Sequence, residues 1–145
     1  MSIPSWDDYA VNLLRNISSR SQDPDTKVGC VILDTKKRIV GTGYNSPPSG
    51  VDLDMHEKER PNKYNYMIHA EVNAILYAEK DKLEDSTLYV DFLPCVECAK
   101  IICQVGVRRV VYCTDYKSKA KNANHDIAVD ILERKGVILE KYCLQ

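Results

Sequence analysis

Two short stretches of this sequence carry residue types that together can do metal chemistry. The first is His69-Ala70-Glu71, and the second is the pentapeptide Pro-Cys-Val-Glu-Cys over residues 94–98. Between them they offer one imidazole, two thiols and one carboxylate suited to proton transfer. A catalytic zinc ion takes three protein ligands and leaves its fourth position to water. We therefore assign His69, Cys95 and Cys98 as ligands of one Zn²⁺, and Glu71 as a base that does not bind the metal.

The spacing suits a single metal ion if both stretches open helices. Positions i and i+3 share a helical face, so Cys95 and Cys98 can bind the same ion. His69 and Glu71 would diverge in mid-helix, but in a first turn their side chains lean back past the open N-terminal end. That end carries a partial positive charge, which favours the thiolate of Cys95. Either stretch alone has an ordinary explanation, as a chance triplet or as buried or redox-active thiols, and only their combination favours the zinc site.

The composition indicates one globular domain over residues 1–145. Hydrophobic residues make up 44% of the chain and charged residues 28%, and the net charge is −1. This charge argues against a long nucleic-acid track. No apolar run approaches the roughly 20 residues that span a bilayer, and residues 1–5 lack the pattern of a secretory signal. Two of the six cysteines are assigned to zinc, and the set fits a reducing compartment, so we expect a cytoplasmic protein.

The hydrophobic periodicity predicts helices alternating with strands. We expect helices over residues 5–18, 68–80, 94–106 and 124–135, with Pro94 at a first helical position. We expect strands over residues 28–33, 39–44, 86–92, 108–112 and 137–142. This order predicts an α/β fold, a three-layer α/β/α sandwich around a five-stranded mixed, mostly parallel sheet. Right-handed crossovers make the last three strands parallel and bring both zinc-bearing helix starts to one side of the sheet.

A long polar segment over residues 45–63 shows no periodicity. Loops of this length in compact domains tend to be functional, and this one ends near His69, so we expect it to wall the active site. His56 within it is either a second metal ligand or a solvated loop histidine, and the second reading is favoured. We expect His125, near the start of the last helix, to be a surface residue without a metal role.

At this point the residues resemble a known family. The segments HAEVNAIL (69–76), LYV with PCVECAK (88–100) and GYN (43–45) are similar to those of deoxycytidylate (dCMP) deaminases, within the cytidine deaminase-like superfamily. H-x-E followed by P-C-x-x-C is the signature of zinc-dependent nucleobase deaminases. The likeness covers nearly the whole chain, and the GYN segment with Asp23-Pro24 and Lys27-Val28-Gly29 points to the dCMP branch. It implies zinc-dependent hydrolysis of dCMP to dUMP and ammonia, with Glu71 carrying the proton.

The resemblance also assigns contacts to the substrate. It implies that Asn45 hydrogen-bonds the deoxyribose or the base edge. The backbone N–H of Ala70 and the carbonyl of Leu93 would meet cytosine O2 and the leaving amino group. Tyr116 would stack on the base, and the phosphate would lie among three basic residues, Lys27, Lys63 and Lys117.

The same resemblance extends to regulation and assembly. Allosteric members of the family are homohexamers that dCTP activates and dTTP inhibits, and a triphosphate effector would bring Mg²⁺ with it. Ser46 stands where the family usually has glycine and lacks glycine's backbone freedom, which counts against unchanged dCTP/dTTP control. If arginine is usual at the three basic positions, lysine offers point charges instead, and a more tolerant pocket would accept dCTP as well as dCMP.

Two other functions stay open at this stage. A nucleic-acid base deaminase, such as a tRNA adenosine deaminase, shares both motifs but needs a basic groove and exposed aromatic side chains. The basic clusters at residues 36–38 and 117–121 offer positive charge for such a groove, so this function remains an alternative. A non-catalytic zinc-binding module would have a fourth protein ligand and no need for Glu71.

Overall fold

The computed structural model, which describes residues 2–114 and 123–144, is built on a five-stranded sheet. Its strands are β1 (Gly29–Leu33), β2 (Ile39–Tyr44), β3 (Thr87–Phe92), β4 (Arg109–Thr114) and β5 (Ile138–Lys141), in the order β2-β1-β3-β4-β5. β1 is antiparallel to both of its neighbours, β2 and β3, whereas β3, β4 and β5 are parallel. Every strand except β1 therefore runs in the same direction, which confirms the predicted mixed, mostly parallel sheet.

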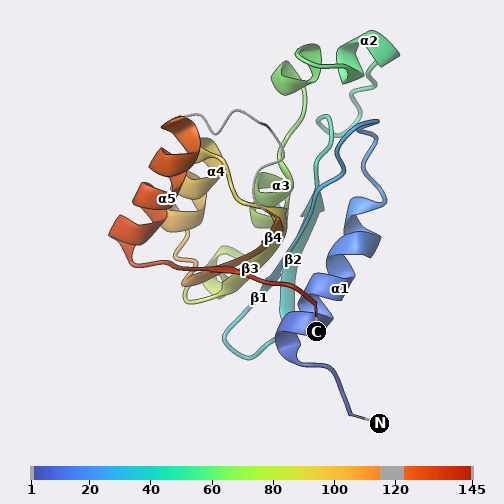
Figure 1. The fold of residues 1–145 in the computed structure, drawn as a ribbon. Coiled ribbons are helices and arrows are strands. Elements are labelled where there is room, and N and C mark those ends of the chain that lie inside the picture. Colours follow the sequence, from blue (N-terminus) through green and yellow to red (C-terminus); the bar gives the residue numbers. More distant parts are fainter. Residues whose placement is uncertain (1, 115–122, 145) are drawn as a thin grey trace.

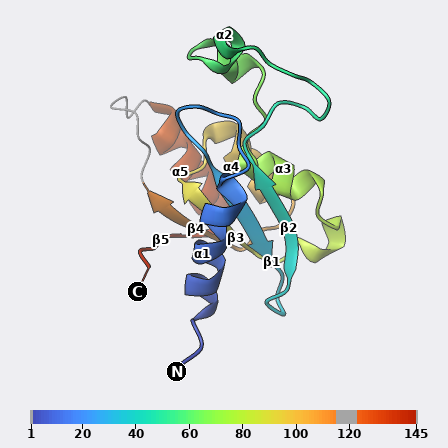
Figure 2. The same ribbon diagram turned by 90° about the vertical axis from the view of Figure 1, so that its right-hand side faces the viewer.

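Helix α1 (Trp6–Ser18) covers one face of this sheet (Figure 2). It begins as the sequence predicts, because the Ser5 hydroxyl accepts a hydrogen bond from the backbone N–H of Asp8 at 3.0 Å. The buried side chains of the helix pack against apolar residues of β1, β3 and β4, and the cluster comprises Ala10, Val11, Leu14, Val31, Leu33, Tyr89 and Val111. This face holds the smaller of the two hydrophobic clusters.

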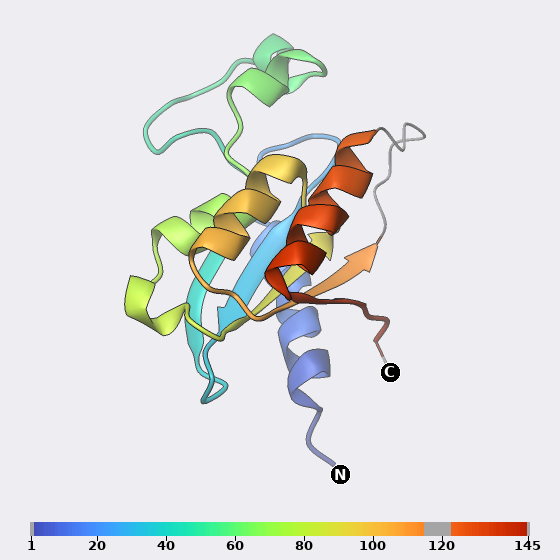
Figure 3. The ribbon, with the colours of Figure 1, turned by 90° about the vertical axis from the view of Figure 1, so that its left-hand side faces the viewer.

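Helices α3 (Ala70–Leu76), α4 (Val96–Gln104) and α5 (Ala123–Lys135) cover the opposite face (Figure 3). Cys30 and Ile32 of β1 lie in the core on this side, and Val31 and Leu33 of the same strand lie in the core under α1. The strand is thus buried on both faces, as its unbroken apolar run indicates. The three predicted layers are confirmed.

The backbone of α3 packs directly onto β2 through glycine. A Cβ atom on Gly43 would lie 2.5 Å from the carbonyl oxygen of Ala70 and 2.5 Å from the backbone nitrogen of Ala74. Only a residue without a side chain allows this approach, which sets the first turn of α3 against the end of β2.

Helix α3 is shorter than the predicted helix over residues 68–80. It ends at Leu76, and a separate 3₁₀ turn, η2 (Lys80–Lys82), follows. The Lys80 ammonium group donates hydrogen bonds to the carbonyl oxygens of Ile75, Leu76 and Ala78 at 2.8–3.2 Å. A lysine that the periodicity places inside the helix instead satisfies the carbonyls at its end.

The start of α4 also differs from the prediction. Cys95 is the N-cap residue and Pro94 precedes it, so the proline is not the first helical residue. The predicted end is confirmed, since Gly106 follows the helix with a φ of +87°.

The segment between β2 and α3 projects from one end of the sheet (Figure 1). It contains α2 (Met55–Lys58) and the 3₁₀ turn η1 (Asn62–Asn65), where the sequence predicts only a loop. The Asp54 carboxylate accepts from the backbone N–H of Glu57 at 2.8 Å, and the Glu57 carboxylate accepts from that of Asp54 at 3.1 Å. This reciprocal capping box stabilises a helix too short to show periodicity.

His125 lies in the first turn of α5, and the helices of the described chain can also be compared with the length of a membrane span. His125 is 8% exposed, so the expectation of a surface residue was wrong: its position in the first turn of α5 lies on the packed side of the helix. Across residues 2–114 and 123–144, no helix combines the length and the apolar character needed to cross a membrane.

Candidate active site

The three predicted metal ligands lie at the starts of α3 and α4. His69 and Cys95 are the N-cap residues of these helices, and neither side chain makes the usual capping hydrogen bond. Cys98 lies one turn into α4 and is buried. Both helices follow strands, β2 and β3, that run in the same direction, so their N-terminal ends meet at one edge of the sheet.

The ligating atoms converge closely enough to share one metal ion. His69 Nδ1 lies 3.3 Å from Cys98 Sγ and 3.4 Å from Cys95 Sγ. All three atoms lie within 4.8 Å of one another, and within the described part of the chain no fourth histidine, cysteine or carboxylate joins them. One nitrogen and two sulfur donors with an open side form the ligand set of a catalytic zinc site. The residues therefore fit Zn²⁺, with the imidazole binding through Nδ1.

The electrostatics at the two sulfur atoms favour metal binding. A hydrogen bond from Cys98 and a second from His69 lower the pKa of Cys95 to about 4. The pKa of Cys98 is raised, first because its thiol donates to the Cys95 thiolate and then because it is buried. The lowered pKa of Cys95 favours its thiolate, the form of cysteine that binds metal ions.

Glu71 lies in the first turn of α3 and is 5% exposed. Burial raises the pKa of its carboxyl group above the ordinary value of 4.5. A raised pKa makes the carboxylate a stronger proton acceptor, which suits a general acid–base catalyst. The structure thus places a buried carboxyl group in the same cavity wall as His69 and Cys95.

A cavity of about 450 Å³ opens beside this centre. It is lined at the metal centre by His69, Glu71 and Cys95, and from the surrounding loops and strand ends by Asp23, Asp25, Thr26, Val28, Asn45, Arg60, Lys63, Tyr64, Met67, Ala70, Phe92 and Leu93. Arg60, Lys63, Tyr64 and Met67 come from the projecting segment. The expectation that this segment walls the site is therefore confirmed.

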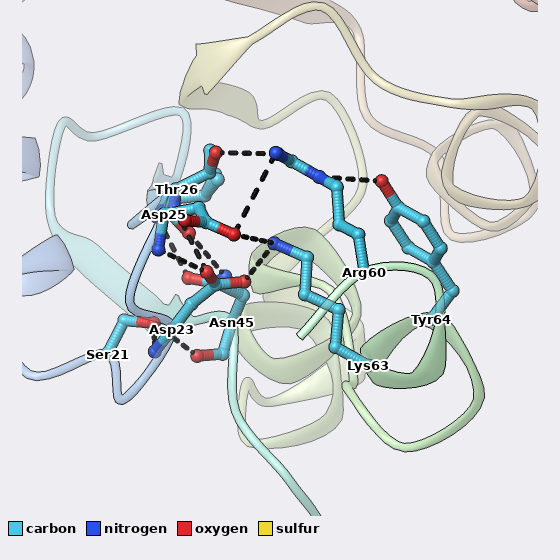
Figure 4. Close-up of polar contacts among 9 residues, drawn as sticks. Ser21, Asp23, Asp25, Thr26, Asn45, Arg60, Lys63 and Tyr64 are labelled. Atoms are coloured by element: carbon cyan, nitrogen blue, oxygen red, sulfur yellow. Dashed lines mark hydrogen bonds and ion pairs between the residues drawn. The ribbon is translucent and has the colours of Figure 1, made fainter. Parts of the chain in front are cut away.

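A buried ion pair crosses from the projecting segment to the turn that precedes β1 (Figure 4). Lys63 Nζ lies 2.7 Å from Asp23 Oδ2, and the two side chains are 5% and 3% exposed. The other oxygen of Asp23 accepts from the backbone N–H groups of Asp25 and Thr26 at 2.8 and 3.0 Å. These contacts hold the pKa of Asp23 below its ordinary value although burial opposes them.

Arg60 lies beside this pair and is more exposed. Its Nε–H donates to the Tyr64 hydroxyl at 2.8 Å, and Nη2–H donates to the Thr26 hydroxyl at 3.0 Å (Figure 4). Nη1 lies 3.8 Å from Asp25 Oδ2. The guanidinium group is thus held at the cavity from two sides.

Asn45 is buried at the cavity wall and joins three backbone segments. Its side-chain carbonyl accepts from the N–H of Val28 at 2.8 Å, and its NH₂ group donates to the carbonyl of Thr26 at 2.9 Å. Its own backbone carbonyl accepts from the Ser21 hydroxyl at 2.8 Å. Each side-chain atom can make one more hydrogen bond, so Asn45 can orient a ligand only while it also braces the turn.

The other predicted site residues divide into three groups. Ala70 and Leu93 line the cavity, and the N–H of Ala70 lies in a first helical turn, where it has no acceptor within the helix. Lys27 is exposed and is not among the described residues of the cavity wall. Tyr116 and Lys117 lie outside the described residues.

The candidate second ligand, His56, is exposed, and the Asn62 side chain lies 3.1 Å from its Nε2. It does not belong to the group of three metal-binding residues found in the described chain. The sequence favours a solvated loop histidine. His56 is solvated, but it belongs to the short helix α2 and not to a loop.

No sequence pattern singles out Arg60, and Asp23 enters only within the Asp23-Pro24 segment that points to the dCMP branch. Nothing local indicates that the Asp23 carboxylate meets Lys63, 40 residues later. The density of basic and aromatic residues over 58–66 is a signal that could have drawn attention to Arg60 and Tyr64.

The fold and the three converging ligands define a class of zinc-binding α/β protein. Residues 4–114 match the family described as the cytidine and deoxycytidylate deaminase zinc-binding region, and the chain belongs to this family.

Several of the proteins to which this chain is similar are named for deoxycytidylate. It is 36% identical over 116 residues to deoxycytidylate deaminase of Mus musculus, a match that covers 76% of this chain and 65% of the mouse protein. It is 35% identical over 125 residues to deoxycytidylate deaminase of Mycobacterium phage D29, covering 77% and 97% of the two chains. The dCMP deaminase of cyanophage S-TIM5 in complex with dCMP and dUMP superposes with a TM-score of 0.74 at 25% identity, covering 98% of this chain and 100% of that one. The chain spans 50% to 65% of the length of the first animal relatives that it matches.

Proposed function

We propose that this protein is a deoxycytidylate deaminase, which hydrolyses dCMP to dUMP and ammonia. The observation that supports this most directly is the buried Glu71 carboxyl group beside three converging zinc ligands, His69, Cys95 and Cys98. A structural zinc site has four protein ligands and no use for a buried base, which disfavours a non-catalytic module. The relatives named for deoxycytidylate support dCMP as the substrate.

His69, Cys95 and Cys98 would hold the zinc ion, and the bound ion supplies a hydroxide at neutral pH because it lowers the pKa of water to about 7. Glu71 takes the proton released from that water and delivers it to N3 of cytosine, which makes C4 electrophilic. The oxygen of the water molecule would add to C4, which becomes tetrahedral and carries a hydroxyl group. Glu71 would take a second proton from the hydroxyl group now on C4 and pass it to the amino group. The C4–N bond breaks, ammonia leaves, and the C4 carbonyl of dUMP forms. The raised pKa of Glu71 suits its role as the proton acceptor.

The remaining side of the site would recognise the rest of the nucleotide. We assign the N–H of Ala70 to cytosine O2, the carbonyl of Leu93 to the leaving amino group and the Asn45 amide to the deoxyribose or the base edge. Ala70 and Leu93 line the same cavity as Glu71, which supports these roles. Tyr116 would stack on the base, and Lys27 and Lys117 are assigned to the phosphate. Lys63, the third basic residue that the resemblance assigns to the phosphate, is paired with Asp23.

We propose further that the enzyme is a cytoplasmic homohexamer regulated by dCTP and dTTP, with Mg²⁺ accompanying the triphosphate. Six cysteines without a disulfide suit a reducing compartment. Ser46 argues for altered regulation, since its hydroxyl accepts a hydrogen bond from the Asn73 side chain at 3.1 Å and so ties the segment to α3. Deamination of dCTP itself is a second activity to be tested.

The experiment is a substrate panel with ammonia release as the readout. Zinc-loaded protein is given cytidine, deoxycytidine, CMP, dCMP and dCTP, each with and without added dCTP or dTTP. The expected result is the highest kcat/KM with dCMP. Turnover of a tRNA substrate in place of every nucleotide would contradict the proposal, and no turnover at saturating dCTP would remove the second activity.

A further inference from the structure

Within the described part of the chain, two positively charged side chains line the cavity, and they differ in burial and in partners. Among the described residues that line it, Arg60 and Lys63 are the only arginine and lysine. Lys63 is 5% exposed and paired with Asp23, whereas Arg60 is 51% exposed. Lys63 and Asp23 form a buried pair without net charge, and such a pair attracts an anionic ligand only weakly. The guanidinium group of Arg60 therefore supplies most of the attraction for an anion.

Lys63 is held by its role in the fold. Its Nζ also lies 4.0 Å from Asp25 Oδ2, so both acidic groups of the turn over residues 23–26 face it. Moving the ammonium group to a ligand would leave the buried Asp23 carboxylate without its cation, which is strongly unfavourable. Asp23 in turn fixes the N–H groups of Asp25 and Thr26. The ion pair therefore sets the position of the turn against the projecting segment.

Arg60 has the geometry of a ligand-binding group. Tyr64 and Thr26 each accept one of its N–H groups, and these bonds orient the guanidinium plane at the cavity. Of its five N–H groups, two are used in this way. The 3.8 Å separation from Asp25 is longer than a hydrogen bond, so the remaining donors can turn to an anion. A planar fork of two N–H groups matches two oxygens of a phosphate.

We propose that Arg60 is a specificity-determining residue that binds the phosphate of the substrate, and that Lys63 is a positioning residue that acts through Asp23. Asp25 competes with the phosphate for the guanidinium group. The Thr26 hydroxyl, which accepts from Arg60, donates its own hydrogen to a phosphate oxygen. This inference rests on the proposed function and names the residue by which that site selects a nucleotide over a nucleoside.

The test compares dCMP with deoxycytidine in two ways. Turnover gives the ratio of kcat/KM values, and calorimetry on the zinc-loaded Glu71→Gln protein gives the ratio of Kd values without chemistry. We expect Arg60→Ala to lower both ratios by about 10- to 100-fold, the loss in turnover appearing in KM, because a hydrogen-bonded charge pair is removed. Arg60→Lys should restore part of the loss, and Asp25→Asn should lower the KM for dCMP severalfold.

The positioning role of Lys63 is tested by the melting temperature of the protein. Lys63→Met should lower the melting temperature by several degrees, and adding Asp23→Asn should recover most of it, because no buried charge is then unpaired. Arg60→Ala should leave the melting temperature within about 2 °C. The inference is overturned if Arg60→Ala leaves the dCMP-to-deoxycytidine ratio unchanged, or if Lys63→Met lowers that ratio with no loss of melting temperature. Wild-type protein that does not deaminate dCMP refutes the proposed function instead, and the calorimetric ratios still decide the role of Arg60.

Discussion

Glu71 is the residue on which the proposed chemistry depends most. Replacing it with glutamine keeps its shape in a buried position but removes the group that carries the proton. We expect Glu71→Gln to bind zinc as the wild type does and to lose turnover by about 10²- to 10⁴-fold. Ammonia release and zinc content, measured on the same preparation, check this. Glu97→Gln on the exposed side of α4 is the matched control, and a Glu71 variant within tenfold of wild type would refute the role.

The metal ligands should respond differently from the base. His69→Ala or Cys95→Ser removes one of three ligands, so zinc should be lost on dialysis and activity with it. Cys143→Ser, at an exposed cysteine outside the group, should keep a full complement of zinc. Atomic emission after dialysis measures both. Retention of one zinc per chain in the Cys95 variant would show that the ligand set is wrong.

At the scale of single residues, the sequence predicts those site residues that lie within short motifs. His69, Glu71, Cys95 and Cys98 fall in two short motifs whose spacing alone requires helix N-termini, and the structure brings the three ligands together there. Asp23, Arg60 and Lys63 could not be found in this way, because their contacts join residues 34 to 40 positions apart that share no motif.

The approach of α3 to β2 is the feature of the elements that positions the site. A methyl group at Gly43 would meet backbone atoms of Ala70 and Ala74 at 2.5 Å, and backbone cannot move aside as a flexible side chain does. We expect Gly43→Ala to shift the start of α3, to cost about 1–3 kcal/mol of unfolding free energy and to lower kcat more than tenfold. Urea unfolding and ammonia release measure these. Thr42→Ala, at the exposed neighbour on β2, is the control, and equal effects from both would contradict the account.

A second element-scale prediction concerns α1 and pH. Arg109 of β4 donates two hydrogen bonds of 2.9 Å to Asp7 of α1, and these lower the pKa of Asp7 below its ordinary value of 3.8. The Tyr89 hydroxyl donates to the same carboxylate at 2.7 Å. The contribution to stability is therefore complete above the ordinary pKa and is lost as pH falls through the lowered one.

Asp7→Asn tests this coupling of α1 to the sheet. We expect a loss of about 2 kcal/mol in unfolding free energy that is constant from pH 7 to pH 5 and shrinks below pH 4. Denaturant unfolding across this range measures it, with Asp130→Asn on the exposed face of α5 as control. A difference that grew as pH fell would contradict the assigned pKa shift.

Element types could be predicted from periodicity, but several ends could not. The helix predicted to reach residue 80 ends at Leu76, because Lys80 lies beyond the helix and caps its last carbonyl groups. The spacing of apolar residues does not reveal this contact. The short α2 depends on one capping box, Asp54 with Glu57, inside a stretch without apolar repeats.

For the whole molecule, assembly is the main open prediction. We expect sedimentation equilibrium to give six times the 16.5 kDa mass of one chain, and dCTP or dTTP to change activity without changing that mass. A monomer at micromolar concentration would refute the hexamer and would leave the chemistry at Glu71 untouched.

The layer order could be predicted from the alternation of strands and helices, whereas the direction of β1 against β3 required the structure.

The most direct test of the central claim is the coordination of zinc itself. X-ray absorption at the zinc edge of the loaded protein should show two sulfur neighbours at about 2.3 Å and two nitrogen or oxygen neighbours at about 2.0–2.1 Å. One of the light atoms should be lost or replaced when a cytosine-based transition-state analogue binds. A shell of four protein atoms that the analogue does not alter would contradict the account.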